Sequence, residues 1–288
     1  MIRWAPRRTA WFLATGAPGV ALAPWALGPD TVSVGFALGF ATFLLGHTVG
    51  LHRGVLHRSF AAPRPVRDAL VWLFVLIGLG GPLAWIRVHD QRDHWQNQPT
   101  APPWFRYDHG AARDLWWNLH TVYDDGRTWL RDEDRADPWL GWLQRTWVWH
   151  NVAGFVVLFA VGGWRHLVVG GLLRVWLSLV LHWWVGYEAH ARGSVAYPIT
   201  GAVECGRNRP ILGILSLGEG FHNNHHAFPD SARIGHRPGE LDAGWLVIRA
   251  LERMGLARDV RVPGRGATRR GESSESSECL EDHEPTDR

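Results

Sequence analysis

Four stretches of this sequence are apolar and approach the length of about 20 residues that a helix needs to cross the hydrocarbon core of a bilayer. They pair into two hairpins, because only Gly28 to Thr31 separate the first from the second and residues 162–166 separate the third from the fourth. A fifth apolar stretch, 69–85, is interrupted by glycines and a proline and is expected at the membrane interface. The four candidate spans are 11–27, 32–51, 147–161 and 167–185.

Positive charge orients these hairpins. Arginines precede the first span and follow the second, whereas the turns inside the hairpins are short and nearly uncharged. Lys and Arg stay on the cytoplasmic side of a membrane. We therefore expect an all-α integral membrane protein with four transmembrane helices, a cytoplasmic helical cap and both termini in the cytoplasm. A cleaved signal peptide is the alternative for the N terminus, but Pro24 and the second span argue against it.

Charge also separates the C-terminal tail from the body. Seven acids and one Arg give residues 271–288 a net charge of −6, and the whole chain carries +3, so the other 270 residues carry +9. We expect a membrane domain over 1–262 and a disordered acidic tail over 263–288. Two cysteines exclude a disulfide-rich secreted scaffold. No nucleic-acid-binding motif is present, so the basic body predicts an anionic lipid bilayer as partner, in a bacterial cell membrane.

Histidines cluster just beyond the expected membrane ends. Residues at i, i+3 and i+4 of a helix share a face, so His222, His225 and His226 can converge. Neutral imidazole binds Fe, Zn, Cu and Ni. Four clusters on one side of the membrane indicate a polynuclear metal site at the cytoplasmic helix ends. The other three clusters hold His47, His52 and His57; His89 and His94; and His182 and His190.

The fourth span also carries a polar stripe of residues spaced by four. A charged side chain inside a span, here Arg174, indicates a function. An Arg that reaches outward to the membrane interface is the alternative. The stripe consists of Arg174, Ser178, His182, Gly186 and His190.

Two of the clusters resemble the histidine boxes of the membrane fatty acyl desaturases, in particular the acyl-CoA Δ9 (stearoyl-CoA type) branch. His52-Arg53 with His57-Arg58 resembles the first box of that family, and residues 218–229 resemble the third box almost residue for residue. His190 resembles the last histidine of the family's fourth span. The similarity extends over residues 10–262.

The second box departs from the family pattern. The family has one His, two spacers and a pair of His, whereas here His89 is followed by Arg92 and Asp93 at the positions of the pair. Gly186 stands where the family has an Asn. We expect Asp93 to replace one imidazole with a carboxylate ligand, although a surface Asp93 paired with an arginine is the alternative. Further candidates for replacement are His47, His94 and His182.

The resemblance implies a centre of two iron ions that uses O2 as co-substrate and removes one hydrogen from each of two neighbouring carbons of a fatty acyl chain. It also implies an external electron donor, a ferredoxin or a cytochrome b5-like protein, with its reductase. Acyl-CoA is the expected carrier, with carrier protein and phospholipid left open. No catalytic residue is expected beyond the metal ligands, which are His52, His57, His89, Asp93, His190, His222, His225 and His226.

Two acids beside these ligands have possible supporting roles. Glu219 lies in the third box and can orient a ligand His through its second ring nitrogen. Glu188 either does the same or faces water. The predicted function is an O2-dependent di-iron fatty acyl desaturase. Hydroxylation on the same scaffold, and a non-catalytic membrane metal-binding protein, which the altered second box favours, are the alternatives.

Overall fold

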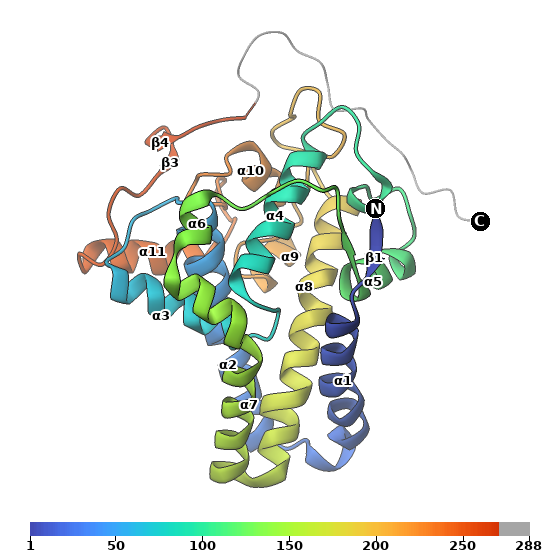
Figure 1. Ribbon diagram of the computed structural model, residues 1–288. Coiled ribbons are helices and arrows are strands. Elements are labelled where there is room, and N and C mark those ends of the chain that lie inside the picture. The colour runs from blue at the N-terminus through green and yellow to red at the C-terminus, as the bar shows by residue number, and fades with distance from the viewer. Residues whose placement is uncertain (271–288) are drawn as a thin grey trace.

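The chain folds into a narrow stalk of long helices beneath a wider cap of shorter ones (Figure 1). This computed structural model describes residues 1–270. The acidic tail expected over 263–288 therefore lies largely outside the described residues.

Two helical hairpins build the stalk, and both turn at its far end (Figure 1). Gly163, with φ 72°, reverses the second hairpin, where a residue with a Cβ is strained. An ion pair of 3.6 Å between Asp30 and Arg165 joins the tips of the two hairpins. The first hairpin consists of α1 (Pro6–Ala26), α2 (Pro29–Ala41) and its π-helical continuation η1 (Thr42–Leu56), and the second of α7 (Pro138–His166), η3 (Leu167–Leu173) and α8 (Arg174–Ala191).

All four expected spans are helical, but fewer helices pass a test of length and hydropathy. Within residues 1–270, two continuous helical stretches are long and apolar enough to cross a membrane, Pro29–Leu56 and Pro138–Ala191. The second of them contains the third and fourth expected spans on either side of Gly163. Helix α1 does not pass, because its Trp, Pro, Gly and Thr residues lower its mean hydropathy.

Large apolar side chains cover the outside of the stalk. Phe36 is 71% exposed and Val161 is 86% exposed, values that are unfavourable in water over so wide an area. The surface therefore suits contact with lipid. Its other members include Leu13, Val20, Leu22, Trp25, Phe40, Val156, Val157, Phe159, Leu177 and Leu181.

Short helices and small strand pairs form the cap. β1 (Ile2–Trp4) pairs antiparallel with β2 (Thr121–Tyr123) and ties the N terminus to the cap. β3 (Val262–Pro263) and β4 (Gly266–Ala267) form a second pair. The helices are α3 (Arg64–Val75), α4 (Pro82–Gln96), η2 (Pro103–Phe105), α5 (Ala111–His120), α6 (Asp132–Ala136), α9 (Pro210–Leu215), α10 (His222–Ala227) and α11 (Ala243–Arg253).

The main apolar core joins η1 to the cap and so fixes the helix that carries the first histidine box. Helix α3 approaches η1 so closely that a Cβ on Gly46 would lie 2.3 Å from the backbone nitrogen of Phe74. The interrupted stretch 69–85 becomes α3 and the start of α4, separated by a turn in which Gly78 and Gly80 have φ of 86° and 120°. The core residues are Leu51, Val55, Leu56, Val71, Phe74, Val75, Ile77, Ile86, Leu140 and Leu143.

Candidate metal centre

Seven of the eight predicted ligands come together in two groups at the junction of stalk and cap. Within each group, one ring nitrogen of every histidine lies within 4.8 Å of the corresponding nitrogens of the others. The ring centroids of His222 and His225, which belong to different groups, are 5.6 Å apart, so the groups adjoin. The four-His group is His52, His57, His89 and His225, and the three-His group is His190, His222 and His226.

The π-helical backbone of η1 brings the two histidines of the first box together. In an α-helix, residues five apart point in directions about 140° apart. Hydrogen bonds of the i to i+5 type, such as the 3.0 Å bond from the His57 N–H to the His52 carbonyl, widen the turn. The ring centroids of His52 and His57 are consequently only 4.9 Å apart.

Helix α10 carries three ligands and is positioned by its two asparagines. It spans six residues, too few to be stable alone. The Asn223 side-chain oxygen accepts hydrogen bonds of 2.7 Å from the backbone N–H groups of Ala196 and Tyr197. Asn224 accepts one of 2.7 Å from Asn208. The third box thus contains its own anchors to the loop that precedes it.

The burial and protonation of these histidines fit a bound metal. Nε2 of His222 lies 3.1 Å from Nε2 of both His190 and His226, an arrangement in which hydrogen bonds alone leave one nitrogen unpaired. Nε2 of His57 and of His225 are buried without a hydrogen-bond partner. Burial lowers the pKa of His222 to about 3 and that of His226 to about 4. Neutral imidazoles whose lone pairs converge are what a metal ion requires.

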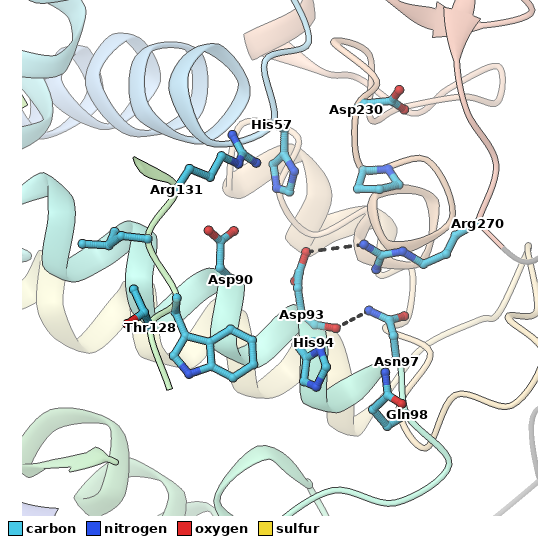
Figure 2. Close-up of a pocket in the computed structure, with 13 residues that line it drawn as sticks. His57, Asp90, Asp93, His94, Asn97, Gln98, Thr128, Arg131, Asp230 and Arg270 are labelled. Atoms are coloured by element: carbon cyan, nitrogen blue, oxygen red, sulfur yellow. Dashed lines mark hydrogen bonds and ion pairs between the residues drawn. The ribbon is translucent and has the colours of Figure 1, made fainter. Parts of the chain in front are cut away.

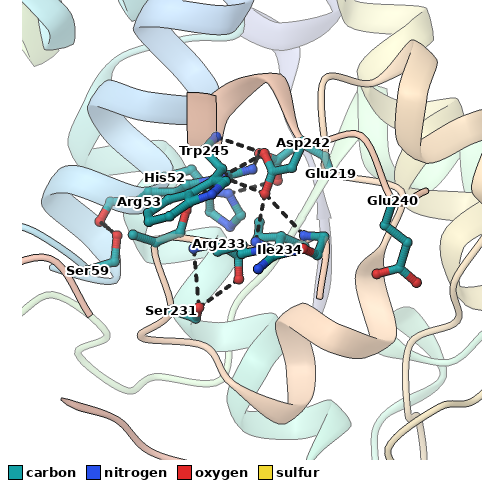
Figure 3. A network of polar contacts seen from close by, with 12 residues as sticks. His52, Arg53, Ser59, Glu219, Ser231, Arg233, Ile234, Glu240, Asp242 and Trp245 are labelled. Atoms are coloured by element: carbon teal, nitrogen blue, oxygen red, sulfur yellow. Dashed lines mark hydrogen bonds and ion pairs between the residues drawn. The ribbon is translucent and has the colours of Figure 1, made fainter. Parts of the chain in front are cut away.

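Behind the four-His group, a buried network supports His52 (Figure 3). A Glu219 carboxylate oxygen lies 2.8 Å from His52 Nδ1, the contact that the sequence suggested for this acid. Arg53, 1% exposed, lies 3.5 Å from Glu219 and 2.9 Å from Asp242. Burial raises the pKa of Glu219, but His52 and Arg53 outweigh it and hold that pKa well below its ordinary value. The carboxylate is therefore anionic and orients His52.

Asp93 lies beside the histidines without joining either group. Its carboxylate is 3.7 Å from His89 Nδ1 and 4.0 Å from Arg270, and it lines a cleft of about 690 Å³ that reaches His57 (Figure 2). Burial raises the pKa of Asp93, but His89, His226 and Arg270 hold it below its ordinary value. An anionic carboxylate thus lies beside His89 of the four-His group and lines the same cavity as the three-His group.

Arg92 fills the space created by the second departure from the family pattern. A Cβ at Gly186 would lie 3.8 Å from its guanidinium. The same guanidinium donates to the Asn118 side chain and lies over the Trp104 ring at 5.6 Å. Arg92 and Asp93 therefore bring one positive and one negative charge to the second box, where the family has two neutral imidazoles.

The remaining candidates lie outside the two groups. His94 contacts the Trp129 ring and lines the cleft of Figure 2. Glu188 pairs with two arginines rather than with a histidine. Arg174 neither faces the metal centre nor reaches outward, since it donates to the carbonyls of Gly170 and Leu76. The arginines that contact Glu188 are Arg192 and Arg209.

A cavity of about 1210 Å³ leads from both histidine groups between the stalk helices. Its walls near the histidines include Tyr107, whose ring stacks on His190 at 4.4 Å, a contact that no sequence pattern indicated. Further away the walls are mainly apolar, which suits a long aliphatic ligand. The apolar lining includes Trp11, Phe12, Leu79, Val88, Trp147, Val148, Leu179 and Val185.

Fold and site define a helical protein whose histidine-rich, metal-binding centre lies at the end of an apolar cavity. The sequence model of the fatty acid desaturase family matches residues 25–238. The chain belongs to this family, so the resemblance and the expected class of oxidoreductase are confirmed. Relatives that are 30–31% identical to this chain are named as desaturases that act at different positions of the acyl chain.

Three relatives illustrate the range. A chloroplastic palmitoyl-monogalactosyldiacylglycerol delta-7 desaturase of Arabidopsis thaliana is 31% identical over 262 residues, 86% of this chain and 67% of the relative. An sn-1 stearoyl-lipid 9-desaturase of Synechocystis is 30% identical over 244 residues, 81% and 72% of the two chains. An acyl-CoA C20 Delta5-desaturase of Anemone leveillei is 30% identical over 240 residues, 79% and 73%.

Proposed function

We propose that this protein is an O2-dependent di-iron desaturase that introduces a double bond into a fatty acyl chain. The observation that carries the proposal is the position of two adjoining groups of histidines at the end of a largely apolar cavity. The substrate is a long acyl chain, held as acyl-CoA or as an acyl lipid, since the relatives include desaturases of both kinds.

In this proposal each histidine group holds one iron ion. His52, His57, His89 and His225 bind the first, and the three-His group binds the second together with the Asp93 carboxylate. The Asp93 carboxylate lines the same cavity as the three histidines of this group, which supports the assignment. Carboxylates are ordinary iron ligands in helical di-iron sites. Within the described residues, His47, His94 and His182 join neither group.

The bound iron would supply activation of O2 and oxidation of C–H bonds, which protein side chains cannot perform. The chain's own residues orient and shield the reactants. Glu219 fixes the ring of His52 through Nδ1 and leaves its other nitrogen for the metal. Apolar walls formed by residues such as Leu79, Val88 and Val185 exclude water from the aliphatic chain.

The stalk is the proposed membrane domain, within residues 1–262. Helices α1, α2, α7 and α8 cross the bilayer in this proposal, which makes four spans with both termini in the cytoplasm of a bacterium. The apolar outer surface of the stalk and the arginines at its cap end support this orientation. A ferredoxin or a cytochrome b5-like donor, with a reductase, supplies electrons from the cytoplasmic side.

Product analysis of host lipids tests the proposal. Expression of the wild-type chain in an aerated bacterial host is expected to yield new monounsaturated acyl chains, detected by gas chromatography. His222→Ala, which removes the histidine that lies between His190 and His226, is expected to yield none. His94→Ala is the matched control, because His94 flanks the second box but lies outside both groups.

Three results contradict parts of the proposal. Hydroxylated chains in place of unsaturated ones identify a hydroxylase. The absence of both products, from a folded chain that binds metal, identifies a non-catalytic metal-binding protein. Unsaturated chains that persist in His222→Ala overturn the site.

A further inference from the structure

Two histidines line the cavity beside the metal centre but belong to neither histidine group. His47 precedes His52 by one turn of the π-helix, and His182 precedes His190 by two turns of α8. Both therefore lie on the stalk side of the proposed ligands, and their ring centroids are 4.9 Å apart. Among residues 1–270, no third His, Cys, Asp or Glu forms a metal-type group with them.

His47 is buried without a polar partner. It is 3% exposed, and neither of its ring nitrogens makes a hydrogen bond. Besides His182, its neighbours include the rings of Phe43 at 4.7 Å and Trp85 at 5.0 Å, and that of the proposed ligand His52 at 5.6 Å between centroids. A neutral imidazole has one N–H donor and one acceptor, and burial of both without partners is unfavourable. By contrast, the buried His109 in the cap lies 2.9 Å from an Asp114 oxygen.

His182 has one of its nitrogens occupied by Trp85. The indole Nε1–H, which can only donate, lies 3.4 Å from His182 Nε2. A neutral His182 therefore carries its proton on Nδ1 and offers a second donor at this level of the cavity. His47 and His182 therefore place unused hydrogen-bonding nitrogens side by side in a mainly apolar channel.

We propose that His47 and His182 bind an oxygen substituent, a hydroxyl or an oxo group, carried by the acyl chain close to the carbons that react. This inference rests on the proposed function, because it assigns the substrate class of the same cavity. A plain methylene at this position leaves both nitrogens of His47 unpaired, whereas a hydroxyl oxygen can pair with one of them and with Nδ1–H of His182. Sites built for a hydrogen bond discriminate strongly against analogues that lack the group.

A competition assay on the purified full-length chain in detergent tests this. Octadecanoic acids with one hydroxyl, placed at each chain position in turn, compete with a fluorescent fatty acid, and unsubstituted octadecanoic acid is the reference. We expect one position of the hydroxyl to bind about tenfold more tightly than the reference, the scale of one net buried hydrogen bond. In His47→Leu and in His182→Leu this maximum is expected to disappear.

Two further variants distinguish the loss of a hydrogen bond to the substrate from a change in side-chain packing. His47→Gln keeps a donor and an acceptor and is expected to retain part of the preference. His150→Leu is the matched control, since His150 lies on α7 outside the cavity and has its ring nitrogens occupied by Trp72 and Thr146. It is expected to keep the full preference.

A position series without a maximum in the wild type overturns the inference, and so does a maximum that both leucine variants retain. The assay needs no turnover, so it is independent of the proposed reaction. If the inference fails alone, double bonds still form in plain chains. If the proposed function fails, no chain is desaturated, whatever the binding series shows.

Discussion

The two histidine groups differ in how completely the protein supplies a metal site. The four-His group has four imidazoles and a buried network behind it. In this network Glu219 contacts His52, and Arg53 contacts both Glu219 and Asp242. The three-His group has three imidazoles, a stacked Tyr107 behind His190 and the altered second box beside it. The four-His group offers four imidazoles to a metal, whereas the three-His group offers three and has the altered residues Arg92 and Asp93 nearby.

This difference teaches how a sequence can lose a pair of histidines and retain a metal-binding arrangement. Replacement of two neutral imidazoles by an Arg and an Asp leaves the net charge of the pair unchanged. The guanidinium takes the space beside Gly186, and the carboxylate remains close to His89.

Two neighbouring residues of α10 test whether the two histidine groups are separate iron sites. His225 and His226 are adjacent in sequence but belong to different groups. His225→Ala and His226→Ala are each expected to lose one of two irons per chain, as measured by metal analysis. Turnover should fall more than about 100-fold in both, since loss of supporting contacts alone costs about 10–100-fold.

The identity of the missing iron distinguishes the two variants. Mössbauer spectra of the wild type should contain two components, and each variant should lack a different one. Loss of both irons from either variant would show that the groups do not form independent sites. Retention of both would remove these residues from the ligand set.

The second prediction concerns Asp93. Asp93→Ala removes the only carboxylate proposed for the three-His group, and we expect the second iron to bind more weakly by about 100-fold, while the first is retained. Asp93→Asn keeps an oxygen ligand and should be intermediate. Asp90→Ala, one turn earlier on α4 and in the same cleft, is the control. Two irons bound at unchanged affinity in Asp93→Ala would leave the acid as a surface partner of Arg270.

Much of the fold and site could be predicted because local spacing determined it. The i, i+3, i+4 pattern of the third box forms a short α-helix, as predicted, but its histidines divide between the two groups, His222 and His226 in one and His225 in the other. The turns within both hairpins fall where the short breaks in the apolar pattern placed them. Such features depend on neighbours in the sequence, which a single chain reveals.

Other features depend on distant contacts and could not be predicted. The π-helical conformation of η1, which packs closely against α3, could not be read from the spacing of its residues. Arg174 donates to two carbonyls, one of them that of Leu76 just after α3, instead of facing the site or the membrane surface. Asp93 joins neither histidine group, and its carboxylate lies 3.7 Å from His89 and 4.0 Å from Arg270, a residue almost 180 positions later in the chain.

The third prediction concerns Glu219 and the four-His group. Glu219→Gln keeps the size of the side chain but removes the charge that faces His52 and Arg53. We expect iron in the four-His group to bind about 10–100-fold more weakly, because an uncharged amide orients and polarises the imidazole less well. Iron in the three-His group should change little, so metal titration should show one weakened and one unchanged site.

Glu188→Gln separates orientation of a ligand from loss of a buried charge. Glu188 is as buried as Glu219, 7% against 6% exposed, but its carboxylate contacts only arginines among the partners observed. Its replacement leaves Arg192 and Arg209 without their acid and should lower thermal stability without weakening either iron. If Glu188→Gln and Glu219→Gln weaken iron equally, the effect is one of general stability. The four-His group then owes its completeness to its histidines alone and not to the network behind them.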